Sequence, residues 1–330
     1  MAALANTFQT TAAKGNREKL SDVVSRLTPE DTPILTAIGT ESIDGVHPEW
    51  ETIDLNAPGT NVVAEGDEYT FAASTPAVRM GNYTQIMRKT GIVSGTQDSV
   101  DNAGSAEQSK YQKLMRGKEI KKDVEYSLVS NVASVGGATR VSGGLPSWIV
   151  TNVNRGATGA NGGYSSATGL TVAATDGTQR AFTKALLDDV MQQGYKSGAN
   201  FSLLSVSPYV KSVFVTFMSD ANVASFRYAA SNGNNNSIVA NADIYEGPFG
   251  KIKVMPNRVQ ATNAGVARNA FAIDQDMASW LWLRNIHEDK DVAKTGDAKK
   301  FVLIGEGCLK VKNEKGLGVI ADLFGLTAAS

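Results

Sequence analysis

The sequence predicts an α+β protein in which one long helix is combined with many short strands and with extended excursions. Three observations predict this class. Helical periodicity is sustained over one long stretch, from Ser105 to about residue 132, whereas most other apolar segments are short and β-like. The 32 glycines greatly outnumber the 9 prolines. Aromatic residues make up only 7% of the chain, so strands and turns are favoured over a compact helical bundle.

Length and charge set limits on function. With 330 residues, the chain can form one large or two modest domains, whose core needs no disulfide or metal. The 32 basic and 33 acidic residues give a net charge of −1, which argues against a protein whose main role is to bind nucleic acid. No apolar run approaches the roughly 18 residues of a membrane span. The start, Met1–Thr7, lacks the basic region of a secretory signal, so cytoplasmic synthesis without export is expected.

The N-terminal region predicts an arm with two small helices. Residues 1–15 are small and polar and predict an unstructured arm. A short amphipathic helix follows, and its apolar residues at i, i+3, i+4 and i+7 are Leu20, Val23, Val24 and Leu27. Thr32, Pro33 and Gly39 predict a second small helix over residues 32–38. Little nearby chain can cover these apolar residues, so they are expected to dock on a distant segment of the same subunit or of another.

Residues 46–94 predict β structure around a long excursion. Strands are expected at 50–55, at 69–72, where Tyr69 and Phe71 alternate with small residues, and at 84–94. The intervening residues 56–68 include too few large apolar side chains to form a core of their own. We therefore expect a long two-stranded excursion here.

The stretch that begins at Ser105 predicts the longest helix. At 1.5 Å per residue it would be about 42 Å long. Its many charged residues predict either a solvated face with i,i+4 ion pairs or a surface for subunit contacts. The acidic residues among them are Glu107, Glu119, Asp123 and Glu125.

The remainder of the chain alternates Gly-rich segments, helices and strands. Residues 134–180 are Gly-rich around an apolar island at 145–150. One helix is expected to begin at Thr183, because the preceding Phe182 can form a hydrophobic staple with Leu187. Another is expected to begin at Ser207-Pro208. Strands are expected at 201–206, 244–246, 251–255, 270–273, 279–283, 301–311 and 318–320.

Residues that could carry catalysis or bind a metal are scarce. His47 and His287 are the only histidines, and Cys308, the only cysteine, lies in an alternating strand and predicts a buried thiol. The acidic run 287–291 lacks the spacing of a Ca²⁺ loop and predicts a solvated charged turn. Two carboxylate pairs remain, Asp188 with Asp189, which are expected to face water, and Asp274 with Asp276. The sequence therefore predicts no catalytic, cofactor-binding or metal site, and no enzyme.

Several short motifs follow one another across almost the whole chain. They are Thr32-Pro33-Ile34-Leu35 with Ile38-Gly39, Trp50 with Asp54-Leu55, Glu65-Gly66, Leu145-Pro146-Ser147-Trp148-Ile149, Ala293-Lys294-Thr295-Gly296-Asp297-Ala298, Glu306-Gly307-Cys308-Leu309-Lys310-Val311-Lys312-Asn313-Glu314-Lys315 and Gly318-Val319-Ile320. In this order and spacing they resemble the major capsid proteins of tailed bacteriophages, which have the Hong Kong 97 fold. Residues 154–180 and 220–243 match that family poorly. Gly316 stands where the family usually has Ala, which affects at most a local turn.

The resemblance implies a division of the chain into five parts. These are an N-terminal arm (1–45), an extended β loop with flanking strands (46–90), a peripheral domain with a long spine helix (91–133), an axial domain (134–289) and C-terminal strands that return to the peripheral domain (290–330). The axial domain would face the centres of pentamers and hexamers. No scaffolding segment is evident at the N-terminus. Arms and loops that cannot cover their own apolar residues agree with this picture, because neighbouring subunits would cover them.

The resemblance also implies a function. The chain is expected to self-assemble into hexamers and pentamers of an icosahedral shell that encloses the double-stranded DNA genome of a phage. The implied partners are a portal protein, a cement or decoration protein, and packaged DNA bound non-specifically at the inner face, but no membrane. Assembly in the bacterial host cytoplasm and a final place in the virion capsid are expected. The alternatives are an encapsulin-like shell protein of a cellular nanocompartment, a non-icosahedral structural subunit of a tail or surface layer, and an enzyme of unrecognised type.

Overall fold

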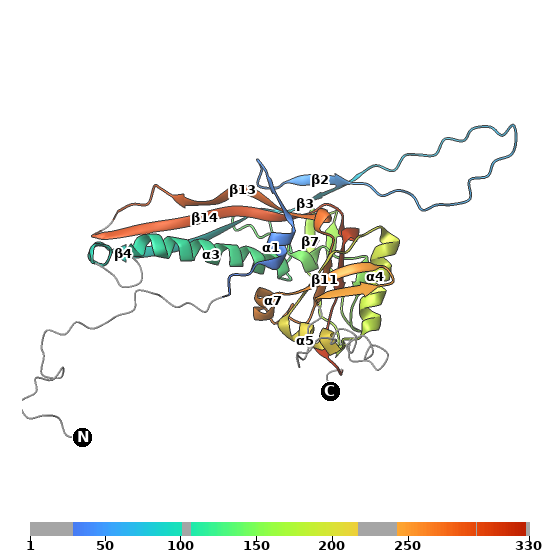
Figure 1. Ribbon diagram of the computed structural model, residues 1–330. Coiled ribbons are helices and arrows are strands. Elements are labelled where there is room, and N and C mark those ends of the chain that lie inside the picture. Colours follow the sequence, from blue (N-terminus) through green and yellow to red (C-terminus); the bar gives the residue numbers. More distant parts are fainter. Residues whose placement is uncertain (1–28, 101–106, 217–242, 295, 328–330) are drawn as a thin grey trace, which may run out of the picture.

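The computed structural model describes residues 29–100, 107–216, 243–294 and 296–327, and it combines helices with sheets, as the sequence predicts. Figure 1 shows an elongated part, built from one sheet and one long helix, that joins a compact part at one end. A long loop projects from the same junction, on the side opposite to the elongated part.

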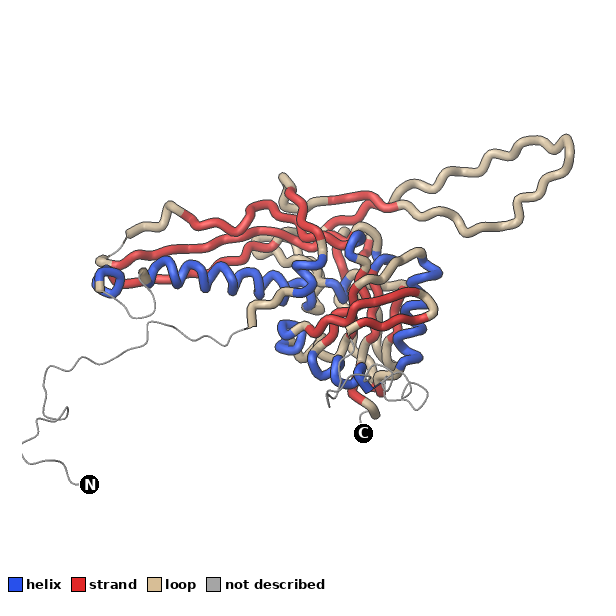
Figure 2. Tube along the Cα trace, viewed as in Figure 1, coloured by secondary structure: helices blue, strands red, loops and turns tan. Residues whose placement is uncertain are grey.

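Four strands and one helix form the elongated part. The strands are β1 (Gly39–Ser42), β4 (Gln85–Ser94), β13 (Ala278–Asp289) and β14 (Ala298–Val311), and the helix is α3 (Gln108–Val129). The sheet order is β1-β13-β14-β4, with β1 parallel to β13 and the other pairs antiparallel. Helix α3 runs along one face of this sheet and contacts mainly β4 and β14 (Figure 2).

The packing of α3 on the sheet requires a glycine in β4. Gly91 lies opposite Phe301 of β14, whose buried ring lies beneath the ammonium group of Lys113 from α3. A Cβ atom at residue 91 would lie 2.2 Å from Cζ of Phe301. Glycine therefore leaves the aromatic ring the space that a side chain at this position would occupy.

A six-stranded sheet forms the centre of the compact part, with the order β10-β11-β9-β12-β15-β5. Its strands are β5 (Asn152–Asn154), β9 (Leu203–Val206), β10 (Ile244–Gly247), β11 (Gly250–Pro256), β12 (Ala270–Ile273) and β15 (Leu317–Ile320). The helices α4 (Lys184–Ser197) and α5 (Pro208–Thr216) pack against it. The side chains of β9 pack against a different apolar cluster on each face of the sheet. Leu204 and Val206 contact the cluster that contains α4 and α5, whereas Leu203 contacts the cluster that contains α3.

The six-stranded sheet thus separates two apolar cores. The larger core is continuous between the elongated and compact parts, because Ile120 and Leu128 of α3 belong to the same cluster as Phe271 and Leu317 of the six-stranded sheet. The second core lies between the other face of this sheet and the helices α4 and α5. Burial of this kind stabilises a fold by about 25 cal/mol for each Å² of apolar surface removed from water.

Shorter elements complete the fold. The short helices are α1 (Pro33–Ala37), α2 (Gly95–Ser99) and α7 (Arg258–Thr262), with 3-10 turns η2 (Leu145–Ser147), η4 (Gln275–Met277) and η5 (Glu314–Gly316). Three two-stranded pairs are formed by β2 (Glu49–Thr52) with β3 (Val78–Gly81), β6 (Gly163–Ser165) with β7 (Leu170–Val172), and β8 (Arg180–Ala181) with β16 (Leu323–Gly325). The pair β2–β3 is the base from which the long loop, residues 53–77, projects.

Most predicted elements are confirmed within a few residues. The longest predicted helix is α3, the small helix predicted at 32–38 is α1, and the strand predicted at 270–273 is β12. The apolar island at 145–150 contains the buried turn η2. The amphipathic helix predicted around Leu20–Leu27 lies outside the described residues.

Two predictions are wrong. Residues 69–72 form no strand, because the long loop has no neighbouring backbone within the described chain with which they could pair. Residues 287–289 are not a turn but the end of β13, where His287, Glu288 and Asp289 lie opposite Ile304, Leu303 and Val302 of β14. A charged sequence forms a strand here because β14 extends alongside it and because Lys113 of α3 pairs with Glu288.

Candidate assembly surfaces

The two histidines lie in different parts of the fold, His287 near the end of β13 and His47 near β2. His287 is exposed, and its Nδ1 atom lies 2.7 Å from the carbonyl oxygen of Asn285. The ring of His47 stacks on Tyr83, with centroids 4.1 Å apart, near the base of the long loop. Across the described ranges, no three His, Cys, Asp or Glu side chains gather as a metal site. None of the described helices has the length and apolar character needed to cross a bilayer.

The two carboxylate pairs are bonded to their surroundings. Asp188 accepts a hydrogen bond from the hydroxyl of Tyr245, and Asp189 accepts one from Gln193 Nε2 at 2.8 Å. Both side chains are half-buried, so they face water only in part. Asp274 accepts a hydrogen bond from the backbone N–H of Asp276 at 3.1 Å and thereby caps η4. Asp188 and Asp189 thus bond α4 to neighbouring side chains, and Asp274 caps a turn.

A buried carboxylate ties the sheet of the elongated part to the chain segments beside it. Glu306 of β14 is 3% exposed. Its Oε1 atom accepts hydrogen bonds from Thr84 Oγ1 at 3.0 Å and Arg140 Nη2 at 2.6 Å, and its Oε2 atom accepts one from Arg284 Nε at 3.0 Å. Burial raises the pKa of Glu306, but the hydrogen bonds from Thr84, Arg140 and Arg284 outweigh burial and hold this pKa below its ordinary value of 4.5. Glu306 is therefore ionised at neutral pH.

A second buried carboxylate joins three segments. Glu125 of α3 is fully buried. Its oxygens accept hydrogen bonds from the backbone N–H groups of Ile34 at 3.0 Å and Leu35 at 2.8 Å, and from Asn257 Nδ2 at 2.6 Å. Asn257 also caps α7. Burial raises the pKa of Glu125 despite these donors. The carboxylate thus links α1, α3 and α7.

Of the two alternatives for the charged residues of α3, subunit contacts stay a prediction, and the structure corrects the other, a solvated face with i,i+4 pairs, in two respects. Glu125 faces the core. Several of the ion pairs join α3 to other elements rather than to itself, as in Lys113 with Glu288, Lys118 with Glu30, and Asp123 with Lys89. The pairs within the helix, such as Arg116 with Glu119, are i,i+3 pairs.

Aromatic residues anchor the base of the long loop. Trp50 of β2 donates a hydrogen bond from Nε1 to the carbonyl oxygen of Val311 at 2.8 Å. Its ring lies 5.7 Å from that of Trp148, which in turn stacks on Tyr164. Beyond β2, the carboxylate of Asp54 pairs with Lys315 Nζ at 2.8 Å. The loop therefore leaves the body of the protein from a fixed base.

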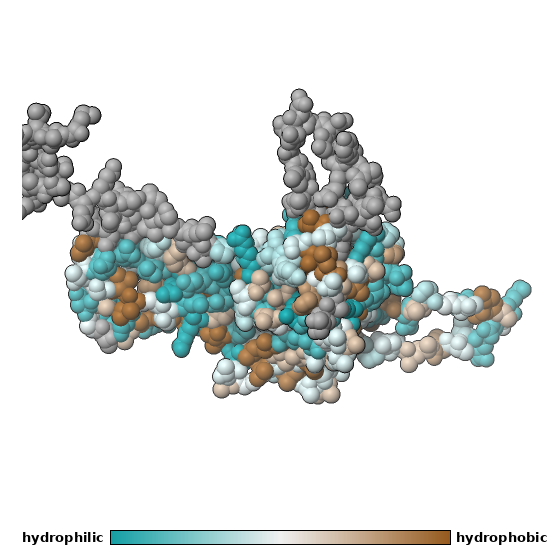
Figure 3. All heavy atoms as spheres, turned by 90° about the horizontal axis from the view of Figure 1, so that it is seen from below, coloured by the Kyte–Doolittle hydropathy of each residue, from teal (hydrophilic) through white to brown (hydrophobic). Residues whose placement is uncertain are grey.

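Beyond this base, the long loop exposes apolar side chains that nothing in the described chain covers. Leu55 is 97% exposed, Phe71 96% and Tyr69 89%. Val62 and Val63 are exposed as well, and Figure 3 shows hydrophobic residues at separate points along the projecting loop, between hydrophilic ones. Large apolar side chains are seldom exposed in such numbers on one segment unless they form an interface. The loop is therefore the strongest candidate surface for association.

The same loop is acidic. Its charged residues are Asp54, Glu65, Asp67 and Glu68, and it contains no Lys or Arg between Glu51 and Arg79. Asp54 is neutralised by Lys315, which leaves three carboxylates near the tip without an oppositely charged residue in the loop. A partner surface is therefore expected to offer cations as well as apolar contacts.

A family model described as SU10 major capsid protein matches residues 5–324. The chain belongs to this family. It is a major capsid protein of a phage, a subunit that forms the shell of the virion, and its family is one of structural proteins.

Further comparisons agree with the family. The major capsid protein of Escherichia phage Phieco32 is 25% identical over 349 residues, with 96% of each chain covered. Among solved structures, the capsid asymmetric unit of cyanophage A-1(L) matches with a TM-score of 0.59 and 12% identity, covering 96% of this capsid protein and 98% of that chain. The fold is therefore the Hong Kong 97 fold of phage capsids.

The predicted alternative, a nanocompartment shell protein, shares this fold. The holo-SrpI encapsulin of Synechococcus elongatus PCC 7942 matches with a TM-score of 0.60 and 10% identity, covering 98% of the capsid protein and 99% of that chain. At this identity the likeness shows the fold alone. The family model and the curated relative both favour the phage capsid.

The one cysteine of the capsid protein is buried, as predicted, and we expect it to be dispensable. Cys308 lies in β14 opposite Leu281 and is fully buried, and burial raises the pKa of its thiol to about 12. Cys308→Ala should therefore cost about 1 kcal/mol of lost apolar contact and leave assembly intact. A thiol reagent should react with wild-type particles only after denaturation. Particles that fall apart in mild reductant would instead indicate disulfides between subunits.

Proposed function

We propose that this capsid protein assembles into hexamers and pentamers of an icosahedral shell, and that the long loop is the contact that each subunit places on its neighbour. The observation that carries the proposal is the exposure of Leu55, Tyr69 and Phe71 on a loop with a fixed base. A two-stranded excursion is at best marginal in water by itself. Contacts with neighbouring copies would cover these side chains and order the loop.

The division of the chain expected from the family resemblance also enters as a proposal. It comprises the N-terminal arm (1–45), the extended β loop (46–90), the peripheral domain with α3 as its spine helix (91–133), the axial domain (134–289) and the C-terminal strands (290–330). Two features support it. The elongated sheet takes β14 from the C-terminal part, and the strands β9–β12 of the compact sheet fall between residues 134 and 289. Two strands cross these bounds, since β13 belongs to the elongated sheet and β15 to the compact one.

The remaining partners follow from the function of a shell. We propose a portal protein, a cement or decoration protein and packaged double-stranded DNA as partners, assembly in the bacterial host cytoplasm, and no enzymatic activity of the subunit itself. The net charge of −1 supports weak, non-specific contact with DNA rather than tight binding.

Expression of the full chain tests the assembly proposal. We expect negative-stain microscopy to show closed particles with six-fold and five-fold capsomers, and size-exclusion chromatography to show the protein in the particle fraction. A chain that stays monomeric or forms open tubes under all assembly conditions would contradict the proposal. Particles that carry an enzyme cargo and exclude DNA when isolated from the natural host would favour the nanocompartment instead.

A further inference from the structure

Strand β4 offers an open sheet edge. It lies at the end of the order β1-β13-β14-β4 and pairs with β14 over its whole length, from Gln85 to Ser94. No described segment pairs with its other edge over these residues. An open edge of this length presents unpaired N–H and C=O groups and is a template for another strand.

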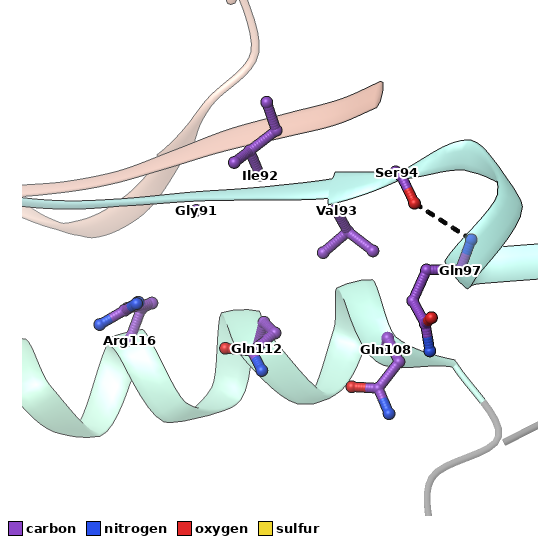
Figure 4. Close-up of a pocket in the computed structure, with 8 residues that line it drawn as sticks. All are labelled: Gly91, Ile92, Val93, Ser94, Gln97, Gln108, Gln112 and Arg116. Carbon is purple, nitrogen blue, oxygen red and sulfur yellow. Dashed lines mark hydrogen bonds between the residues drawn. The ribbon is translucent and has the colours of Figure 1, made fainter. Parts of the chain in front are cut away.

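A groove lies beside this edge, between β4 and α3. Its volume is about 570 Å³, and it is lined by Gly91–Ser94, Gln97, Gln108, Gln112 and Arg116. Figure 4 shows Val93 pointing toward α3 and Ile92 pointing away from it, while Gln112 and Arg116 project from α3 on the groove side. The Nε atom of Arg116 is buried and has no hydrogen-bond partner among the described residues. The groove therefore offers polar donors to an extended chain laid along β4.

The opposite face of β4 offers different chemistry. Ile86 and Ile92 are 54% and 64% exposed on the side away from α3, and Arg88 lies exposed between them. A strand added at this edge would therefore meet apolar residues and one cation on its outer face, and Arg116 on its inner face.

The positive charges of β4 make the β4 edge of a second copy an unfavourable partner for this open edge. Pairing two copies of this edge would bring Arg88 and Lys89 of both into one short stretch, and like charges on adjacent strands destabilise pairing. The partner is instead expected to be extended and acidic, with apolar residues at alternate positions.

Residues 67–72 of the long loop fit this description. In an extended chain Asp67, Tyr69 and Phe71 share one face and Glu68 lies on the other. The alternation that predicts a strand here finds no partner within the described chain. Between Thr52 and Asp67 an extended chain reaches roughly 50 Å, which is enough to cross a neighbouring subunit.

We propose that residues 67–72 of one copy add as a strand to the open edge of β4 of a neighbouring copy. In a parallel register Asp67 would face Arg88. Tyr69 would then lie beside Thr90 and Phe71 beside Ile92, while Glu68 would lie on the groove side of the added strand. This inference rests on the proposed function of the long loop, and it specifies the receiving edge and the mode of pairing.

A proline in the loop tests the backbone pairing. Thr70→Pro removes an N–H group from the added strand and should abolish or sharply reduce particle formation, while the subunit melts as wild type because residue 70 is unpaired in it. Thr60→Pro, in the same loop but outside the proposed strand, is the matched control and should assemble. Particles formed equally well by both variants would overturn the proposal.

A charge exchange tests the pairing of side chains. Arg88→Glu and Asp67→Arg should each weaken assembly, and the double variant should restore it. Hydrogen exchange should show the amides of residues 85–94 and 67–72 gaining protection together when wild-type subunits assemble. Wild-type particles with unchanged exchange in β4, or a double variant no better than either single one, would overturn strand addition. Failure of the wild type to assemble at all would instead refute the proposed function.

Discussion

A subunit in which a short Gly-Ser turn replaces residues Pro58–Pro76 is expected to be soluble, to melt cooperatively and to form no closed shells. The deleted residues contribute nothing to either apolar core, and their large side chains are exposed. The base formed by β2 and β3 remains, with its Trp50 anchor. A shell repeats each subunit contact many times, so even about 1–2 kcal/mol lost per copy should prevent stable assembly.

The measurement pairs microscopy of the assembly reaction with thermal melting of the isolated subunit. Pro58→Ala with Pro76→Ala is the control, since it retains the length and the apolar residues of the loop, and it should assemble. A deletion variant that unfolds would show that the loop belongs to the core. Normal shells would show that the loop is not the contact between subunits.

Glu125→Ala is expected to cause a larger loss of stability than the same substitution of any other charged residue of α3, because Glu125 is the fully buried one among them. It leaves the N–H groups of Ile34, Leu35 and the side chain of Asn257 buried without their acceptor. Each buried donor left without an acceptor costs about 1–3 kcal/mol, so the loss of stability should be several kcal/mol in total. The melting temperature should fall by about 5–10 °C.

The control for this substitution is Glu119→Ala on the same helix. Glu119 is partly exposed and, among the described residues, pairs with Arg116 alone, so its loss should cost less than about 1 kcal/mol. Both variants are best compared in the loop-shortened subunit, where assembly does not contribute. A Glu125→Ala subunit as stable as Glu119→Ala would show that the three donors find other acceptors.

The two buried carboxylates should give opposite pH dependences. The pKa of Glu125 is raised on folding, so its contribution is fully present below about pH 4.5 and is lost as the pH rises through its folded pKa. The pKa of Glu306 is lowered, so its contribution is present above about pH 4.5 and is lost as the pH falls through its folded pKa. Glu125→Gln should therefore remove the loss of stability that occurs as the pH rises above about 4.5. The loss of stability that occurs as the pH falls, which depends on Glu306, should be unchanged.

Local patterns were sufficient to predict most of the fold. Alternation predicts the buried strand that contains Cys308, and the i, i+3, i+4 spacing predicts α3, because periodicity reports which face of an element is buried. The scarcity of His and Cys in the sequence predicts no catalytic or metal site, which favours a function carried by surfaces rather than by a cleft.

The remaining features depend on contacts distant in sequence. In the sequence, Glu125 does not differ from the other charged residues of α3, which are not fully buried. The one local indication of its burial is that it lies between Val124 and Leu128 on the apolar side of the helix. Glu306 is buried only because Arg140 and Arg284 approach it from other segments. Residues 69–72 carry a strand pattern without a partner in the chain, and no local rule supplies the identity of a partner.

The continuous core between the two parts also determines where a closed surface can bend. Because α3 and the six-stranded sheet share one apolar cluster, and Glu125 pins α1 and α7 to the same helix, rotation at this junction would open buried contacts. Strand β13, by contrast, shifts register twice against β14, between Trp282 and Arg284 and between Arg284 and His287. Irregular pairing of this kind bends and twists a ribbon. A closed surface built from this subunit would therefore meet a fixed junction at one end and a bent, twisted β13–β14 ribbon beyond it.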